Sequence, residues 1–187
     1  LSAGIFDLAG RMLAQAVTGT PGHVNSMAES VAHFLAKIPA AKMNPGDHYI
    51  TNDPWLATGH LHDLTVVTPA FRNGRIVGLF ANTAHIIDIG GLGMGPEGRS
   101  VFEEGLYIPI VKCFDRNQPN ETFFDFLRAG SRTPVEPTAT AWAGAHSAVS
   151  SAPLFNKVRV GHRCSNAAYA LAPGANGALW LWPERTF

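Results

Sequence analysis

Hydrophobic and polar positions in the first half of the chain predict a mixture of strands and helices. Residues 2–16, SAGIFDLAGRMLAQA, have short apolar runs on either side of Ala9-Gly10, which predicts two strands joined by a turn. In residues 26–38 the apolar positions recur at helical spacing. This segment predicts a helix whose first turn is capped by Asn25 or Ser26.

The clearest pattern is a hairpin. Two runs rich in β-branched and aromatic residues, HDLTVVTPAF and RIVGLFANTAHI, flank Asn73-Gly74, a dipeptide favoured in tight hairpin turns. We expect strands to dominate from Asp47 to Phe114, and the segment SVFEEGLYIPIVKCF to begin polar and become a strand. Before it, GGLGMGPEG is too rich in glycine for regular structure and predicts a loop.

A short second helix is predicted in NETFFDFLRAG, with Asn120 as its cap and Gly130 as its end. These elements together define the expected fold class, α+β: a mixed, strand-rich core with a few packed helices. With 187 residues, of which 46% are hydrophobic and 15% charged, the chain has room for one domain.

Charge and cysteine content narrow the classes of partner. The formal net charge is zero, which argues against nucleic-acid binding, and no apolar run is long enough to cross a membrane. Cys113 and Cys164 fit neither a disulfide framework nor a metal motif. Two reduced thiols favour a cytoplasmic location.

The composition changes after Glu136. Residues 137–183 contain no Asp or Glu, and neither a helical nor a strand period persists there. Two interpretations remain open for residues 137–187: a variable terminal segment, or a divergent and poorly ordered tail produced by a frameshift.

Two histidines and a carboxylate form the most informative constellation. His60, Asp63 and His85 supply the residue types of many open divalent-metal sites. Asp63 begins the first strand of the hairpin and His85 ends the second, so an antiparallel pairing returns one beside the other. The spacing alone leaves open whether these are ligands or hydrogen-bonded core residues. His62 is expected to be a neighbour rather than a ligand.

Two acidic residues are candidates for supporting roles. Asp88 could orient an imidazole behind the metal, and Glu104 could act as a general base beside it. The glycine-rich loop between them matches no nucleotide-binding fingerprint and favours a flexible loop over a site.

Several stretches in family order resemble the hydantoinase B family, which comprises the C-terminal half of 5-oxoprolinase, N-methylhydantoinase B subunits and the large subunits of acetone carboxylases. They are IFDLAGRMLAQA followed by GHVNSM, then GDHYITNDPWLATGHLHDLTVVTPAF, AHIIDIGG, EEGLYIPIVK and RTPVE. Residues 1–136 are therefore expected to be a hydantoinase B/oxoprolinase-like segment, a partial domain of a larger fold.

The resemblance implies a chemistry. It implies a divalent ion, manganese or zinc, bound by an H-x-x-D pair and a later histidine, which carry over onto His60, Asp63 and His85. It also implies ATP-dependent hydrolysis of a cyclic amide of the 5-oxoproline or hydantoin type. ATP would bind a hydantoinase A-type partner that activates the small-molecule substrate, and the ion here would act as a Lewis acid.

Two alternatives accompany this expectation. Ketone carboxylation by an acetone carboxylase-type large subunit needs the same Lewis acid. Family members are also several times longer than this chain, and the expected continuation is lost after Glu136. The other alternative is therefore a catalytically inactive truncated fragment, and we expect the chain alone to be inactive.

Overall fold

The computed structural model of the chain describes residues 2–16, 20–93, 95–135 and 137–141 and two later strands. The strands are β1 (Ser2–Phe6), β2 (Met12–Ala16), β3 (His48–Thr51), β4 (Asp63–Arg72), β5 (Arg75–His85), β6 (Val111–Asp115), β7 (Gln118–Pro119), β8 (Tyr169–Pro173) and β9 (Leu179–Pro183). The helices are α1 (Pro21–Lys37), η1 (Ala40–Lys42), α2 (Val101–Glu104) and α3 (Glu121–Ala129), and residues 137–141 are also helical. The α+β prediction is confirmed.

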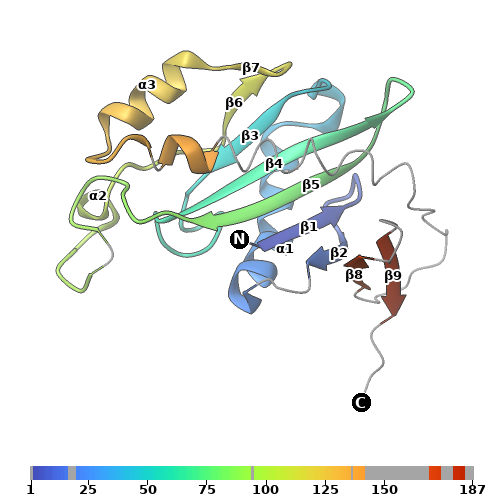
Figure 1. The fold of residues 1–187 in the computed structure, drawn as a ribbon, viewed down its shortest axis with the longest axis horizontal. Helices are drawn as coiled ribbons and strands as arrows, with labels where there is room; N and C mark the ends of the chain where they lie inside the picture. The colour runs from blue at the N-terminus through green and yellow to red at the C-terminus, as the bar shows by residue number, and fades with distance from the viewer. Residues whose placement is uncertain are drawn as a thin grey trace.

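One sheet organises these elements (Figure 1), in the order β7-β6-β3-β4-β5-β1-β2-β8-β9. The first seven strands of that order pair antiparallel, whereas β8 pairs parallel with β2. The long β4–β5 hairpin lies in the middle of the sheet. Among the described residues, no helix combines the length and apolar character of a membrane span.

The β4–β5 hairpin sets the geometry of the site. Asn73 and Gly74 both have positive φ, 51° and 74°, as a two-residue turn between twisted strands requires. The register pairs Asp63 with His85 at the open end, and the pairing shifts between Ala70 and Phe71. That bulge absorbs the extra residue of β5 and keeps the two ends level.

Helix α1 corrects one sequence-based boundary. The helix was predicted from residue 26 but begins at Pro21, and Thr20 is its extended N-cap. Proline suits this position because its fixed φ is helical and its missing N–H needs no partner in the first turn. Ser26, one of the two predicted caps, instead donates its hydroxyl to the Gly22 carbonyl at 2.8 Å. The first turn of α1 therefore precedes the predicted helix.

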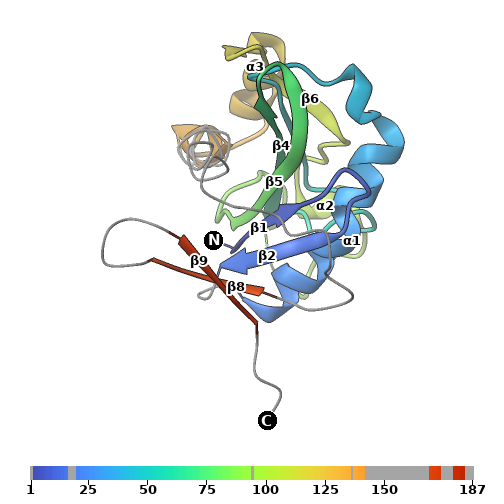
Figure 2. The same ribbon diagram turned by 90° about the vertical axis from the view of Figure 1, so that its right-hand side faces the viewer.

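The two faces of the sheet carry separate cores. On β3 and β4, Tyr49 and Val67 point into the core that α1 covers, while Ile50 and Val66 point into the core that α3 covers. The helix α1 lies to the right of the sheet in Figure 2. Because successive side chains of a strand point to opposite faces, neighbouring apolar residues of β3 and β4 contribute to both cores. The sheet is buried on both sides here, so the site at the end of the hairpin has rigid support.

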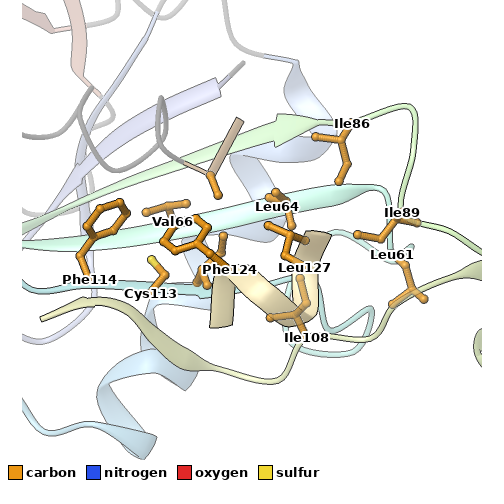
Figure 3. Close-up of a cluster of buried hydrophobic side chains, with 12 residues drawn as sticks. Leu61, Leu64, Val66, Ile86, Ile89, Ile108, Cys113, Phe114, Phe124 and Leu127 are labelled. Atoms are coloured by element: carbon orange, nitrogen blue, oxygen red, sulfur yellow. The ribbon is translucent and has the colours of Figure 1, made fainter. Parts of the chain in front are cut away.

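The core under α3 reaches the open end of the hairpin (Figure 3). Its buried side chains include Leu61, Leu64, Ile86 and Ile89 from the chain around the hairpin end, and Phe124 and Leu127 from α3. The predicted cap of α3 is confirmed, since Asn120 accepts a hydrogen bond from the Phe123 N–H. The segment before β6 differs from expectation, because residues 101–104 form the short helix α2 before the strand starts at Val111.

Residues after Glu136 are described only in part. Ala141 is fully buried in the core under α3. Most of the predicted divergent tail lies outside the described residues, so its boundary and origin stay predictions. Cys113 is a buried free thiol, and Cys164 also lies outside the described residues.

Two glycines with the same backbone conformation test how tightly the loop after β5 is packed. Gly90 and Gly93 have φ of 76° and 77°. A Cβ at Gly90 would lie 2.2 Å from the Gly130 carbonyl oxygen, whereas one at Gly93 would meet no atom of the described residues within 4 Å. Gly93→Ala should cost about 1 kcal/mol for its left-handed backbone. Gly90→Ala should cost about 1–3 kcal/mol more from overlap with backbone. Equal losses in urea unfolding would contradict this packing.

Candidate metal centre

The open end of the hairpin brings a carboxylate and an imidazole together. Asp63 is completely buried at the start of β4, and His85 ends β5 directly opposite. His85 Nδ1 lies 2.9 Å from Asp63 Oδ1. The pairing follows from strand register alone, as the sequence predicted.

His60 completes the group from the loop before β4. Its Nε2 lies 3.3 Å from Asp63 Oδ2, and its ring centroid is 5.5 Å from that of His85. Gly59, with φ of 93°, allows the turn that folds this loop back. One ligand atom from each of His60, Asp63 and His85 lies within 4.8 Å of the others. The structure therefore brings the three predicted residues together.

The donor set fits a divalent metal ion. Asp63 Oδ2 is buried without a hydrogen-bond partner among the described residues, although two imidazole nitrogens approach it. A buried carboxylate oxygen left this way is costly unless a cation neutralises it. Two imidazoles and one carboxylate are a common open set for such an ion.

His23 is a fourth neighbour that the sequence analysis did not single out. It lies in the first turn of α1, and its Nε2 is 3.0 Å from Asp63 Oδ2. Its other ring nitrogen, Nδ1, is buried without a hydrogen-bond partner among the described residues. Pro21 was the sequence signal for the start of α1, and using it would have placed His23 in the first turn of the helix.

His62 forms a second cluster with Glu104. The His62 side chain is 1% exposed, and neither ring nitrogen has a hydrogen-bond partner within the described part of the chain. Its Nδ1 lies 3.9 Å from Glu104 Oε1. Burial lowers the pKa of His62, and the nearby Glu104 carboxylate only partly opposes this. The neutral form, which can coordinate a metal, is therefore favoured.

Glu104 also borders a cavity of about 530 Å³, whose lining includes Trp55 and Arg99. That volume falls in the range of small-molecule sites. Glycines of the glycine-rich loop line the cavity. The N–H groups of Leu92 and Gly93 donate to the carbonyls of Glu103 and Glu104 and hold this loop against α2. The carboxylate of Glu104 thus lies between the histidine cluster and a space that can hold a small molecule.

Asp88 lies apart from these clusters. Its carboxylate accepts hydrogen bonds from the Gly90 N–H and from both the N–H and the hydroxyl of Thr133. Burial alone would raise the pKa of Asp88, but these hydrogen bonds outweigh it and lower the pKa to about 2. None of these bonds goes to an imidazole. Asp88 ties the loop after β5 to the chain that follows α3.

Asp88 should make the free energy of unfolding depend on pH in the acidic range. A carboxyl group with a pKa lowered by about two units contributes about 2–3 kcal/mol that is present above its unfolded pKa near 4. That contribution is lost as the pH falls from about 4 to 2. Asp88→Asn should therefore be less stable than wild type at pH 7, and the gap should close by pH 2. Denaturant unfolding at both values measures it, with Asp125→Asn as the exposed control. A gap independent of pH would contradict the assignment.

The family's sequence model for Hydantoinase B/oxoprolinase matches residues 1–154, so the chain belongs to this family. Among its relatives, 5-oxoprolinase of Saccharomyces cerevisiae is 38% identical over 111 residues, which cover 57% of this chain and 8% of that protein. Caprolactamase subunit beta of Pseudomonas jessenii is 30% identical over 112 residues, covering 54% and 19%.

Solved structures share the fold. The crystal structure of ATP-dependent caprolactamase from Pseudomonas jessenii matches 81% of this chain and 26% of its own, with a TM-score of 0.72 and 24% identity. Nucleotide-free acetone carboxylase matches 83% of this chain and 21% of its own, with a TM-score of 0.71 and 20% identity. The chain thus spans about a quarter or less of the length of these proteins, and the match confirms that it is part of a larger fold.

Proposed function

We propose that this chain is the metal-binding part of an enzyme subunit that hydrolyses a cyclic amide, of the 5-oxoproline or hydantoin type, in an ATP-dependent reaction. One observation carries the proposal: the buried Asp63 carboxylate, whose Oδ2 has no hydrogen-bond partner among the described residues, lies in one group of possible ligand atoms with His60 and His85. Membership of a family that includes 5-oxoprolinases and a caprolactamase supports the class of reaction.

His60, Asp63 and His85 would hold the ion, manganese or zinc. When bound, it would supply Lewis-acid polarisation of the substrate carbonyl. Asp63 contributes the negative charge that offsets the cation, and its complete burial keeps water from competing for its oxygens. The register of β4 and β5 fixes the distance between Asp63 and His85, so these two ligands need little rearrangement to meet an ion.

Glu104 is the group we propose as proton acceptor. Its side chain is 22% exposed and borders the cavity, so it can reach both the histidine cluster and a small molecule. As a general base it would take a proton from the attacking water onto a carboxylate oxygen. Asp88 supports this arrangement indirectly, because it anchors the loop that is bonded to the Glu104 carbonyl.

ATP is proposed to act through a partner of the hydantoinase A type. The caprolactamase relative is described as ATP-dependent and its related chain as subunit beta, which supports a division between subunits. This chain carries no P-loop or dinucleotide fingerprint, which agrees with that division. Ring opening of a stable amide needs an energy input, and an activated substrate from the partner would provide it. We also propose a cytoplasmic location, because the two cysteines fit no disulfide framework.

Ketone carboxylation is the second candidate. The fold it shares with acetone carboxylase favours it, with a TM-score of 0.71. Polarising a ketone requires the same Lewis acid, so the metal ligands do not separate the two reactions.

The test is an assay of the subunit that carries this chain, co-purified with its ATP-binding partner. ATP hydrolysis is measured with 5-oxoproline, hydantoin, caprolactam, or acetone with bicarbonate. We expect a cyclic amide to stimulate ATP hydrolysis and to be opened, and Asp63→Asn to abolish the opening. Stimulation by acetone and bicarbonate alone would select the carboxylase. Full ring opening by the Asp63→Asn variant would overturn the proposed role of the site. The 187-residue chain without a partner is the inactive control.

A further inference from the structure

The His62 ring stacks against His85, but no hydrogen bond among the described residues accounts for its two ring nitrogens. Its ring is buried, yet both nitrogens lack hydrogen-bond partners in the described residues. A buried polar group without a hydrogen-bond partner destabilises the folded state, and a histidine ring carries two nitrogens that need one. A core position of this kind is normally filled by an apolar residue unless the imidazole binds something.

Glu104 faces this imidazole from α2. The distance of 3.9 Å between His62 Nδ1 and Glu104 Oε1 is too long for a hydrogen bond. With His60 the two residues form a second group whose ligand atoms lie within 4.8 Å of one another. Such separations suit atoms that each bind one ion at about 2.0–2.2 Å, after small shifts.

We propose that His62 and Glu104, with His60, form a second divalent-cation position beside the first. The proposal rests on the proposed function only through the shared residue His60. The His60 ring has one lone pair for coordination, so it binds one ion at a time. When both positions are filled, water or substrate replaces His60 on the other ion. Because Glu104 borders the cavity, this second position is accessible to a small-molecule oxygen ligand.

The second position changes what Glu104 can do. An ion bound at Oε1 would make the carboxylate a weaker base, and its other oxygen, Oε2, would remain as the proton acceptor. A residue that only accepts protons affects turnover and not metal content. A ligand affects metal content directly, which makes stoichiometry the deciding measurement.

The experiment is equilibrium dialysis of the purified full chain against Mn²⁺, with elemental analysis and electron paramagnetic resonance. Wild type should bind two ions and show a spin-coupled pair. Glu104→Gln should weaken binding of the second ion by at least about tenfold to hundredfold, the range for residues behind metal ligands, and keep the first ion. Glu103→Gln is the matched control, because its exposed carboxylate bonds the Arg99 N–H and should leave both ions bound. His62→Gln should repeat the effect of Glu104→Gln, with circular dichroism as the check on folding.

The outcomes separate this inference from the proposed function. If wild type binds only one ion and His85→Ala loses that ion, the second position is overturned and the first position stands. Two ions retained in Glu104→Gln would also overturn it, and loss of ring opening in that variant would then assign Glu104 to proton transfer alone. No bound ion in wild type would defeat both proposals.

Discussion

Replacing Asp63 with asparagine is expected to weaken binding of the first metal ion by about 100-fold or more, since even residues behind the ligands are worth 10- to 100-fold. The substitution would keep the shape of the side chain but remove its charge. The ion would then be bound by two imidazoles and the buried amide of the variant, with no carboxylate to offset its charge. Isothermal titration with Zn²⁺ or Mn²⁺ measures the change.

The matched control for this variant is Asp115→Asn at the end of β6. Its side chain is 65% exposed and pairs with Lys112, so the same chemical change there should leave metal affinity unaltered. Comparable affinity in Asp63→Asn and wild type would show that the carboxylate is not a ligand. A loss in both variants would point to general electrostatics instead.

Phe124→Ala is expected to give the largest loss of stability, about 3–5 kcal/mol, as for other buried Phe→Ala changes. The ring is 1% exposed and packs edge-on against Phe114 and Phe123, with centroids 5.4 and 5.1 Å away. A small domain is stable by only about 5–15 kcal/mol, so this loss is a large share of the total. Urea unfolding of the purified chain measures it.

Phe126→Ala on the same helix is the control. Phe126 is 68% exposed, and its removal should change the free energy of unfolding by less than about 0.5 kcal/mol. Phe124 shares its core with Leu61 and Ile86, which follow His60 and His85 in the chain. Phe124→Ala should therefore also weaken metal binding, whereas equal effects of the two substitutions would contradict the packing.

The local part of the site could be predicted from sequence because strand geometry is periodic. Asn73-Gly74 fixes the turn, the turn fixes the register, and the register places Asp63 opposite His85. The cap of α3 followed from Asn120 in the same way, as a contact within a few residues. Each of these predictions depended on a short stretch of chain or on one hairpin.

The remaining contacts could not be predicted because they join segments with no local relation. His23 reaches Asp63 only through the packing of α1 on the sheet, and its helix start had been placed too late. Glu104 approaches His62 from a helix that was expected to be part of an extended segment. Asp88 bonds to Thr133 across 45 positions of the chain. Such contacts depend on the tertiary fold rather than on pattern or spacing.

The most direct test of the metal centre is X-ray absorption spectroscopy of the chain loaded with one equivalent of Zn²⁺ or Mn²⁺. The account predicts two imidazole nitrogens and a carboxylate oxygen at about 2.0–2.2 Å from the ion, with the imidazole signal reduced in His60→Ala and His85→Ala. A shell of oxygen ligands without imidazole scattering, unchanged in both variants, would contradict it.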